Sequence, residues 1–167
     1  MGKTIVVPSF EPVVGPLIFL AGPIQSATDW QARADALLRS WSADINVANP
    51  RSPPPWHGDY DRQTAWEHRY LERARTCGCV LFWLAKEDSH DCSRAYAQTT
   101  RFELGWHFWC HVRDGAPLAV GIEPGFSNER YIRLTLGMYA PDIAVRSTLE
   151  ETCLDAIRLA SKNRLDP

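Results

Sequence analysis

The sequence predicts an α/β domain built on a doubly wound parallel sheet of five strands, in the flavodoxin-like order 2-1-3-4-5, with helices on both faces. Two observations predict this class. Short apolar runs such as Leu17–Ala21 and Cys79–Leu84 are typical of strands buried on both faces. They alternate with longer segments of helical periodicity, which is typical of right-handed βαβ units. With 167 residues and 45% apolar content, the chain is expected to form a single domain over residues 1–167.

Strands are expected at residues 17–21, 46–49, 79–84, 117–122 and 143–145. Residues 1–16 contain the apolar run Ile5–Val7 among several prolines and glycines, which predicts an edge strand or an extended arm. The first full strand ends at Gly22-Pro23, where glycine permits either a simple turn or the close approach of a ligand. The proline-rich segment 52–61 predicts a stiff loop after the second strand.

The helices are predicted from apolar periodicity and capping residues. The first begins after Thr28 or Asp29, the second spans about 63–74, and the third opens near Thr100 and ends at Gly115. The fourth covers 129–138, and the last follows a Ser147-x-x-Glu150 capping box. In the fourth helix we expect three apolar side chains to point inward, namely Tyr131, Leu134 and Met138.

Composition excludes several classes of function. A net charge of −2 and a pI near 6.2 give no electrostatic basis for nucleic-acid binding. No apolar run approaches the ~20 residues of a membrane span, so we expect a soluble protein without a membrane partner. Five cysteines without a CxxC pair indicate reduced thiols and a cytoplasmic location.

No metal or cofactor is expected. The only concentration of possible metal ligands has spacings that match no familiar zinc pattern; it comprises His90, Cys92, His107, Cys110 and His111. The glycine fingerprints of dinucleotide and P-loop sites do not occur. A flavin domain is disfavoured because the segment after the first full strand, Ala21–Ile24, carries no hydroxyl for a phosphate.

Glu103 is the candidate catalytic residue. It follows the strand 79–84 and a polar loop, near the crevice where open α/β folds bind ligands. A helix N-terminus favours an ionised carboxylate, which could act as a nucleophile. The same spacing, Thr100-x-x-Glu103, fits a capping box, and from spacing alone a cap is the more common explanation.

Aromatic residues are frequent for so small a domain. The seven tryptophans fit an aromatic surface around a pocket, an interface, or the core. On the predicted third helix, Phe102, Trp106, Trp109 and Arg113 fall on one line.

Six short motifs resemble the nucleoside 2-deoxyribosyltransferase superfamily, in the order found there and over about residues 17–130. They are Phe19-Leu20-Ala21-Gly22-Pro23-Ile24, Asp29-Trp30, Asn49-Pro50-Arg51, Gln63-x-x-Trp66-Glu67, Leu81-Phe82-Trp83 and Thr100-x-x-Glu103-Leu104-Gly105. The resemblance implies an oligomeric enzyme, a dimer or larger, that cleaves the N-glycosidic bond of a nucleoside or nucleotide. Glu103 takes the position of the nucleophilic glutamate, which forms a glycosyl ester that a second base or water resolves. The departing base also needs a proton donor.

The resemblance also assigns the second acid and the substrate-binding residues. Glu67 stands where better-known members carry an aspartate, as an acid, a base or a hydroxyl ligand, or is merely a solvated helix carboxylate. Another aspartate of those members, six residues before the nucleophile, is here Ala97, with Asp88 and Asp91 as weak substitutes. The remaining predicted substrate-binding residues are Gly22, Pro23, Asp29, Trp30, Asn49, Arg51, Trp66, Thr100 and Asn128.

Three of these residues have open alternatives. Asp29 could close over the substrate or only cap its helix. Arg51 could contact a hydroxyl, phosphate or carboxylate, or tie down the local backbone. Asn128 resembles an asparagine that some relatives donate into a neighbouring subunit's site.

The leading hypothesis is therefore transfer of a deoxyribosyl group between bases. Hydrolysis of a nucleoside 5′-monophosphate is the first alternative, but it needs a phosphate cradle, for which only Arg51, Ser26 and Arg94 are candidates. The second alternative is a non-catalytic nucleotide sensor, which the presence of both Glu103 and Glu67 disfavours.

Overall fold

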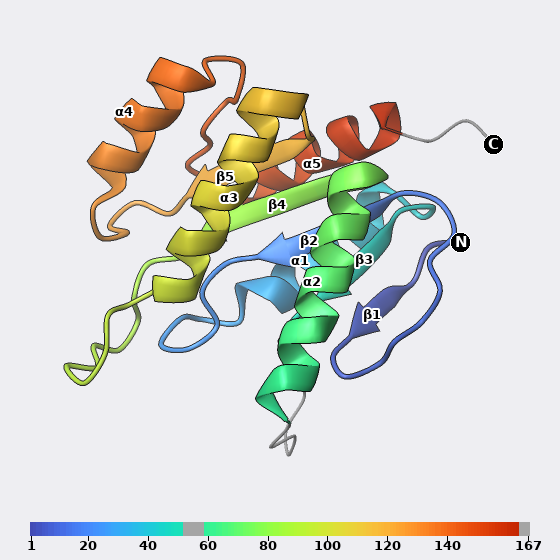
Figure 1. The fold of residues 1–167 in the computed structure, drawn as a ribbon, viewed down its shortest axis with the longest axis horizontal. Coiled ribbons are helices and arrows are strands. Elements are labelled where there is room, and N and C mark those ends of the chain that lie inside the picture. Colours follow the sequence, from blue (N-terminus) through green and yellow to red (C-terminus); the bar gives the residue numbers. More distant parts are fainter. Residues whose placement is uncertain (52–58, 164–167) are drawn as a thin grey trace.

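A five-stranded, all-parallel sheet lies between two layers of helices in the computed structural model, which describes residues 1–51 and 59–163 (Figure 1). The strands are β1 (Thr4–Val6), β2 (Leu17–Ala21), β3 (Asn46–Asn49), β4 (Gly78–Leu84) and β5 (Leu118–Ile122). Their order across the sheet is β1-β3-β2-β4-β5. This arrangement confirms the predicted flavodoxin-like α/β class.

One predicted strand is wrong. Residues 143–145 form no strand, and this segment reaches the sheet only through a single bridge between Gly121 and Arg146. The fifth strand is instead β1, which pairs with β3 at the opposite edge, Ile5 beside Ala48. The N-terminal segment therefore supplies the edge strand that its Ile5–Val7 run allowed.

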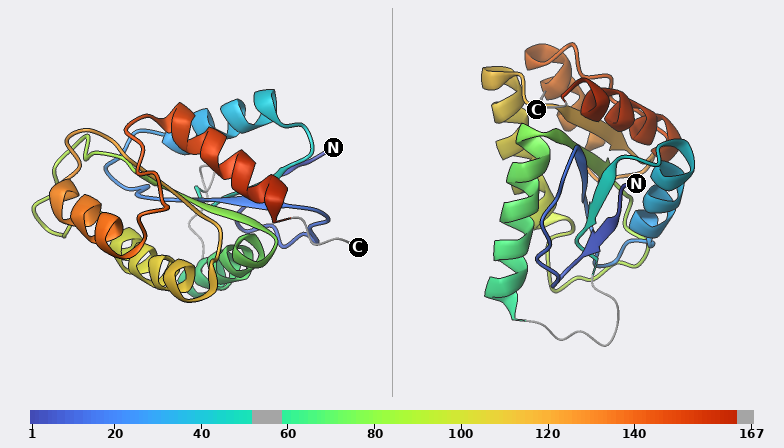
Figure 2. Two further views of the ribbon diagram at one scale, coloured as in Figure 1. Left: turned by 90° about the horizontal axis from the view of Figure 1, so that it is seen from above. Right: turned by 90° about the vertical axis from the view of Figure 1, so that its right-hand side faces the viewer.

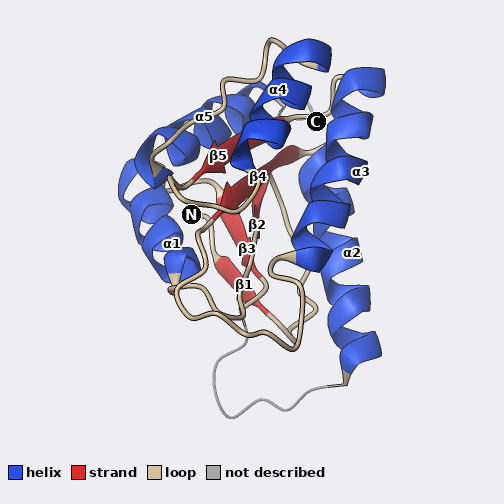
Figure 3. Ribbon diagram, turned by 90° about the vertical axis from the view of Figure 1, so that its left-hand side faces the viewer, coloured by secondary structure: helices blue, strands red, loops and turns tan. Residues whose placement is uncertain are grey.

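Five helices cover the two faces of the sheet. α1 (Trp30–Trp41) and α5 (Leu149–Lys162) lie on one face, and α2 (Tyr60–Thr76), α3 (Gln98–Asp114) and α4 (Glu129–Tyr139) lie on the other (Figures 2 and 3). Alternate side chains of the fully buried strands fill two separate hydrophobic cores, one beneath each helical layer. The segment 52–58, most of the predicted proline-rich loop, lies outside the described residues. No helix among the described residues is long and apolar enough to cross a membrane.

Three details of the helices differ from or refine the predictions. Asp29 is the N-cap of α1, and its carboxylate accepts the backbone N–H of Ala32 at 3.1 Å. The capping box of α5 is formed by Thr148 and Glu151, one residue beyond the predicted pair. The inward placement of the α4 side chains is also wrong, because Tyr131, Leu134 and Met138 are 65%, 53% and 72% exposed.

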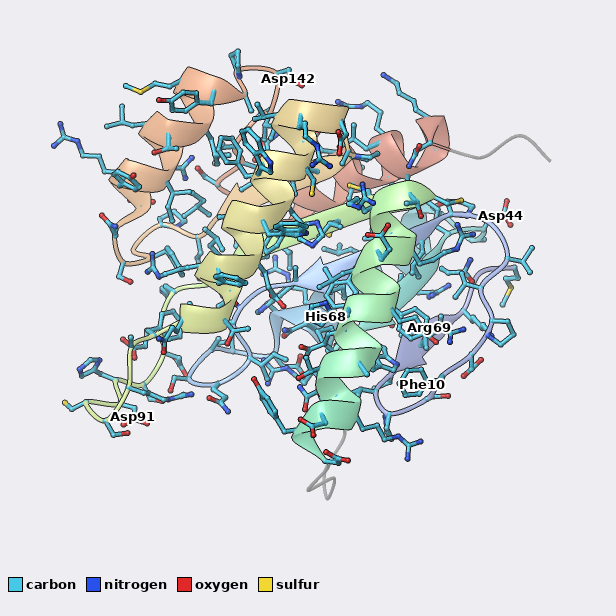
Figure 4. The ribbon with its side chains drawn as sticks, viewed as in Figure 1. Phe10, Asp44, His68, Arg69, Asp91 and Asp142 are labelled. Carbon is cyan, nitrogen blue, oxygen red and sulfur yellow. The ribbon has the colours of Figure 1, made fainter. Side chains whose placement is uncertain are left out.

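The N-terminal arm between β1 and β2 is fastened to α2 by two buried aromatic side chains. The indole N–H of Trp66 donates to the carbonyl of Ser9 at 2.8 Å. The Tyr70 hydroxyl accepts the backbone N–H of Glu11 at 2.7 Å and lies 2.9 Å from the Glu11 carbonyl. The arm does not pair with a strand of the sheet, so side-chain hydrogen bonds from α2 hold it in place. Phe10 lies at its outer side, with the Arg69 guanidinium 5.9 Å from its ring (Figure 4).

Tyr70→Phe should lower the free energy of unfolding by about 1–2 kcal/mol, because it leaves partly buried backbone groups of the arm without partners. Denaturant unfolding measures this loss. Tyr139→Phe is the matched control, since Tyr139 is 66% exposed, and should change stability by less than about 0.5 kcal/mol. Equal stability of the two variants would contradict the tethering role of Tyr70.

Candidate active site

A cavity of about 390 Å³ opens at the carboxyl-terminal edge of the sheet. Its walls come from the β2–α1 loop, the first half of α2, the end of the β4–α3 loop and the start of α3. This is the point where the strand order reverses, because β2 and β4 are neighbours whose following connections diverge to opposite edges. Open α/β sheets bind their ligands at such a switch point.

The start of α3 presents two predicted site residues to this cavity. α3 begins after Ala97, which has a left-handed backbone (φ 56°) and makes no side-chain cap. Thr100 and Glu103, three residues apart, therefore lie within the helix on the face that lines the cavity. The alternative reading of the pair as a capping box is wrong, because neither residue is the N-cap.

Glu103 is a half-buried acid rather than a carboxylate held ionised by the helix. Desolvation by burial, and then the charge of Glu67, raise the pKa of Glu103 to about 7. The expectation that the helix N-terminus keeps it charged is wrong, because the dipole acts mainly within the first turn and Glu103 is the sixth residue of α3. Among the described residues, no hydrogen-bond donor reaches its carboxylate. Near neutral pH the side chain therefore exchanges a proton readily.

Glu67 is the second carboxyl group of the cavity. It projects from α2, is partly buried, and accepts a hydrogen bond at 2.9 Å from the side-chain amide of Gln63 one turn earlier. Burial raises its pKa, although the Gln63 hydrogen bond and nearby His68 oppose the rise. The two carboxyl groups thus line one cavity, and the charge of Glu67 favours the protonated state of Glu103.

The turn after β2 forms the wall opposite these acids. Gly22 and Pro23 line the cavity, and a Cβ at Gly22 would lie 2.3 Å from the Trp83 carbonyl oxygen and 2.6 Å from the Trp30 ring. Only glycine permits this close packing. The Trp30 ring is buried behind the wall, and its N–H donates to the Pro23 carbonyl at 2.9 Å. Trp30 therefore supports the wall and does not line the cavity.

Arg51 is committed to the β2–α1 loop. Its guanidinium donates to the carbonyls of Ile24 and Thr28 at 3.3 and 3.0 Å, and to the Gln31 side chain at 3.0 Å. It also forms an ion pair with Asp29 at 3.1 Å. These contacts match the alternative in which Arg51 ties down the backbone and Asp29 caps a helix; neither residue lines the cavity.

Three other predicted binding residues lie away from the cavity. Trp66 is fully buried against Phe19 and Tyr70. Asn49 accepts the backbone N–H of Arg51 at 2.9 Å and shapes the end of β3. Asn128 is the exposed N-cap residue of α4, in a groove between α3 and α4, so a role for it would concern a different copy of the chain.

Several lining residues carry no role in the sequence-based prediction. They are Phe19, Ala21, Ile24, Gln25, Pro50, Tyr60, Gln63, Ala95, Gln98 and Thr99. Gln63 could have been found, because it stands four residues before Glu67 on a predicted helix, a spacing that brings two side chains together. The others depend on how the loops fold, for which the sequence holds no periodic signal.

The weaker acidic candidates do not join the site. Asp91 lies at the tip of the β4–α3 loop, where it bonds Ser93 and Arg94, and Asp88 is exposed; neither lines the cavity (Figure 4). Within the described ranges, no group of three or more His, Cys, Asp or Glu side chains could hold a metal ion. A larger hollow of about 540 Å³ lies at the other end of α3, but its one acid, Asp142, is 71% exposed and bonded to His111.

Comparisons with known proteins agree with this geometry. The family model described as "Nucleoside 2-deoxyribosyltransferase like" matches residues 15–120, a segment that includes both carboxyl groups and the Gly22 turn. A conserved protein from Enterococcus faecalis V583 has a similar crystal structure, with a TM-score of 0.54 and 13% identity over 87% of this chain and 99% of that chain. At this identity the likeness concerns the fold alone. A search of curated proteins finds no match.

Glu103→Gln should stabilise the protein in neutral and alkaline solution. Glu103 has a folded pKa of about 7 against an ordinary value of 4.5, so the wild type loses stability as pH rises through this interval, while the neutral amide does not. We expect a gain of about 1–3 kcal/mol above pH ~7.5 and none below pH ~4. Denaturant unfolding across this range measures the difference. A gain that is independent of pH would contradict the raised pKa.

Proposed function

Because the chain belongs to the nucleoside 2-deoxyribosyltransferase-like family, we propose that it cleaves the N-glycosidic bond of a deoxynucleoside and transfers the deoxyribosyl group to another base. The observation that carries this proposal is the pair of half-buried carboxyl groups, Glu103 and Glu67, in one cavity beside the Gly22 turn. A cavity of about 390 Å³ lies in the range of small-molecule sites and suits a nucleoside.

In the first step, a carboxylate oxygen of Glu103 attacks the anomeric carbon of the sugar. A carbon–oxygen ester bond forms as the carbon–nitrogen bond breaks, and the base takes the bonding electron pair. Glu67 gives its proton to the departing base and becomes a carboxylate. This division of roles needs one proton on the pair, and the proton must lie on Glu67 when the substrate is bound. In the free cavity the charge of Glu67 raises the pKa of Glu103, so substrate binding has to shift the proton from Glu103 to Glu67.

In the second step, a nitrogen of the incoming base attacks the same carbon and displaces Glu103. Glu67 takes up the proton that this base loses, so the pair returns to its starting state. The acceptor base must fill the place that the first base leaves, because water in that place would hydrolyse the ester.

On this proposal, the predicted substrate-binding residues form two groups: those that line the cavity and those that support its walls. Gly22, Pro23 and Thr100 lie against the substrate, since they line the cavity. Trp30, Trp66, Asn49, Arg51 and Asp29 act indirectly, by holding the β2–α1 loop, α2 and the end of β3 in place.

Hydrolysis of a nucleoside 5′-monophosphate is the second candidate function. It is supported by Arg94, the one cationic side chain among the described lining residues, which donates to the Ser26 hydroxyl at 3.1 Å. Arg94 also bonds Asp91, and Arg51 is occupied by carbonyl groups. A dianionic phosphate would therefore meet a single, already paired guanidinium, which is why transfer on unphosphorylated nucleosides leads.

Glu103→Ala should abolish both base release and base exchange, lowering kcat by at least about 10³-fold, because the one other carboxyl group among the described lining residues, Glu67, is needed as the proton donor. The assay covers deoxynucleosides, ribonucleosides and their 5′-monophosphates, with and without an acceptor base. Asp91→Ala is the matched control and should retain activity, since Asp91 lies outside the cavity.

The outcomes of this assay separate the alternatives. Exchange between bases that vanishes in Glu103→Ala supports the transferase. Base release without exchange, best with 5′-monophosphates, would instead identify the hydrolase. A folded wild type that turns over none of these substrates would contradict the enzymatic proposals and favour a non-catalytic role in nucleotide binding.

Glu67→Gln should lower kcat by about 10²–10⁴-fold, because the departing base loses its proton donor. It should also move the acidic limb of the pH profile to lower pH, since the charge of Glu67 is one of the two causes that raise the pKa of Glu103. The pH dependence of kcat/KM measures both effects. An unchanged acidic limb would show that the two carboxyl groups do not interact.

A further inference from the structure

Gln63 is bonded to one of the two candidate acids in the cavity. It lies one turn before Glu67 on α2, and both side chains line the cavity. The amide nitrogen Nε2 of Gln63 donates to the carboxyl oxygen Oε1 of Glu67 at 2.9 Å. Both residues are partly buried, so water competes less for this bond than it would on an open surface. The bond is therefore a feature of the cavity wall.

This hydrogen bond makes the two carboxyl oxygens of Glu67 unequal. Oε1 accepts the Gln63 amide, whereas Oε2 has no hydrogen-bond partner in the part of the chain that the structure describes. An amide NH₂ group donates and does not accept, so a proton on Oε1 would meet a hydrogen atom of Gln63. When Glu67 is protonated with this bond intact, Oε1 is therefore the carbonyl oxygen and Oε2 carries the proton.

The bond also affects the acidity of Glu67. Desolvation by burial raises the pKa of Glu67, whereas the Gln63 hydrogen bond, and then the charge of His68 on the same helix (Figure 4), lower it. The other titratable side chains among the described lining residues are Tyr60, Arg94 and Glu103. None of these three forms a hydrogen bond with Glu67. Gln63 is therefore the neighbour that both bonds the carboxyl group and makes it a stronger acid.

Resting on the function proposed above, we propose that Gln63 is a positioning residue that holds Glu67 with its proton on Oε2, ready for the departing base. In that step the Oε2–H bond breaks and an N–H bond forms on the base, while the electron pair of the broken bond stays on Glu67. The carboxylate so formed keeps the Gln63 hydrogen bond on Oε1. Gln63 thus orients the acid before proton transfer and stabilises its charge afterwards.

A purely structural role for Gln63 predicts a different result. A pair of polar side chains four residues apart also stabilises a helix, whatever the cavity does. Loss of such a pair would lower the stability of α2 without moving the pH profile of the reaction. The pH profile therefore distinguishes the two roles.

Gln63→Met removes the donor and keeps the length of the side chain. We expect kcat to fall by about 10–100-fold, because the proton is no longer confined to Oε2. Without the hydrogen bond the pKa of Glu67 rises, so the acid keeps its proton longer and the alkaline limb of the kcat/KM profile moves to higher pH. Carbon-13 NMR of the Glu67 carboxyl carbon measures the same shift without turnover.

Gln63→Lys places N–H donors and a positive charge at the same position. It should move both the alkaline limb and the carbon-13 titration of Glu67 to lower pH, opposite to Gln63→Met. General damage to α2 would not produce opposite shifts from two substitutions of one residue. Far-UV circular dichroism verifies that both variants fold.

Thr64→Val is the matched control. Thr64 follows Gln63 on α2, but its hydroxyl donates to the Tyr60 carbonyl at 2.9 Å and it is not among the described lining residues. This variant should keep the wild-type kcat and pH profile. An active wild type whose kcat and alkaline limb are unchanged in Gln63→Met, or shifts in the same direction for Met and Lys, would overturn this inference alone. A wild type without turnover would overturn the proposed function and this inference with it.

Discussion

The burial of two carboxyl groups in one cavity is the constraint on which the site depends. A carboxylate removed from water is unstable unless a cation or a hydrogen-bond donor pairs with it. Among the described lining residues, no cationic side chain forms an ion pair with Glu103 or Glu67. The pair therefore holds a proton at a pH where free glutamates have lost theirs. The core fixes the two helices that carry these acids, because α2 packs on β2 and β4 and α3 packs on β4 and β5.

The opposite wall is rigid for a different reason. The β2–α1 loop has no regular structure from residue 22 to residue 29, yet its carbonyls are held by Arg51 from the end of β3 and by the Trp30 indole. Gly22 fits between the Trp83 carbonyl and the Trp30 ring, where any side chain would collide. Residues that never line the cavity thus fix the position of the wall that a substrate would touch.

Much of this arrangement could be predicted from the sequence, because periodicity reports burial. The strands 17–21, 46–49, 79–84 and 117–122, and the crossover that brings Gly22 near Glu103, follow from apolar runs and the handedness of βαβ units. Features that depend on partners distant in the chain could not be predicted. Ile143–Val145 has the composition of a strand, but Arg146 alone reaches β5, while the short Thr4–Val6 segment pairs with β3 over its full length. The apolar periodicity of α4 indicates an amphipathic helix but not which surface covers its apolar face.

The left-handed backbone at Ala97 connects the fold to the assignment of the acid. In the resemblance, this position is an aspartate, and aspartate tolerates a positive φ better than alanine does. The chain therefore keeps the backbone turn that starts α3 at the cavity edge but carries no carboxylate on it. With Asp88 and Asp91 outside the cavity, Glu67 is the one carboxyl group beside Glu103 among the described lining residues. This acid comes from α2 rather than from the loop before α3.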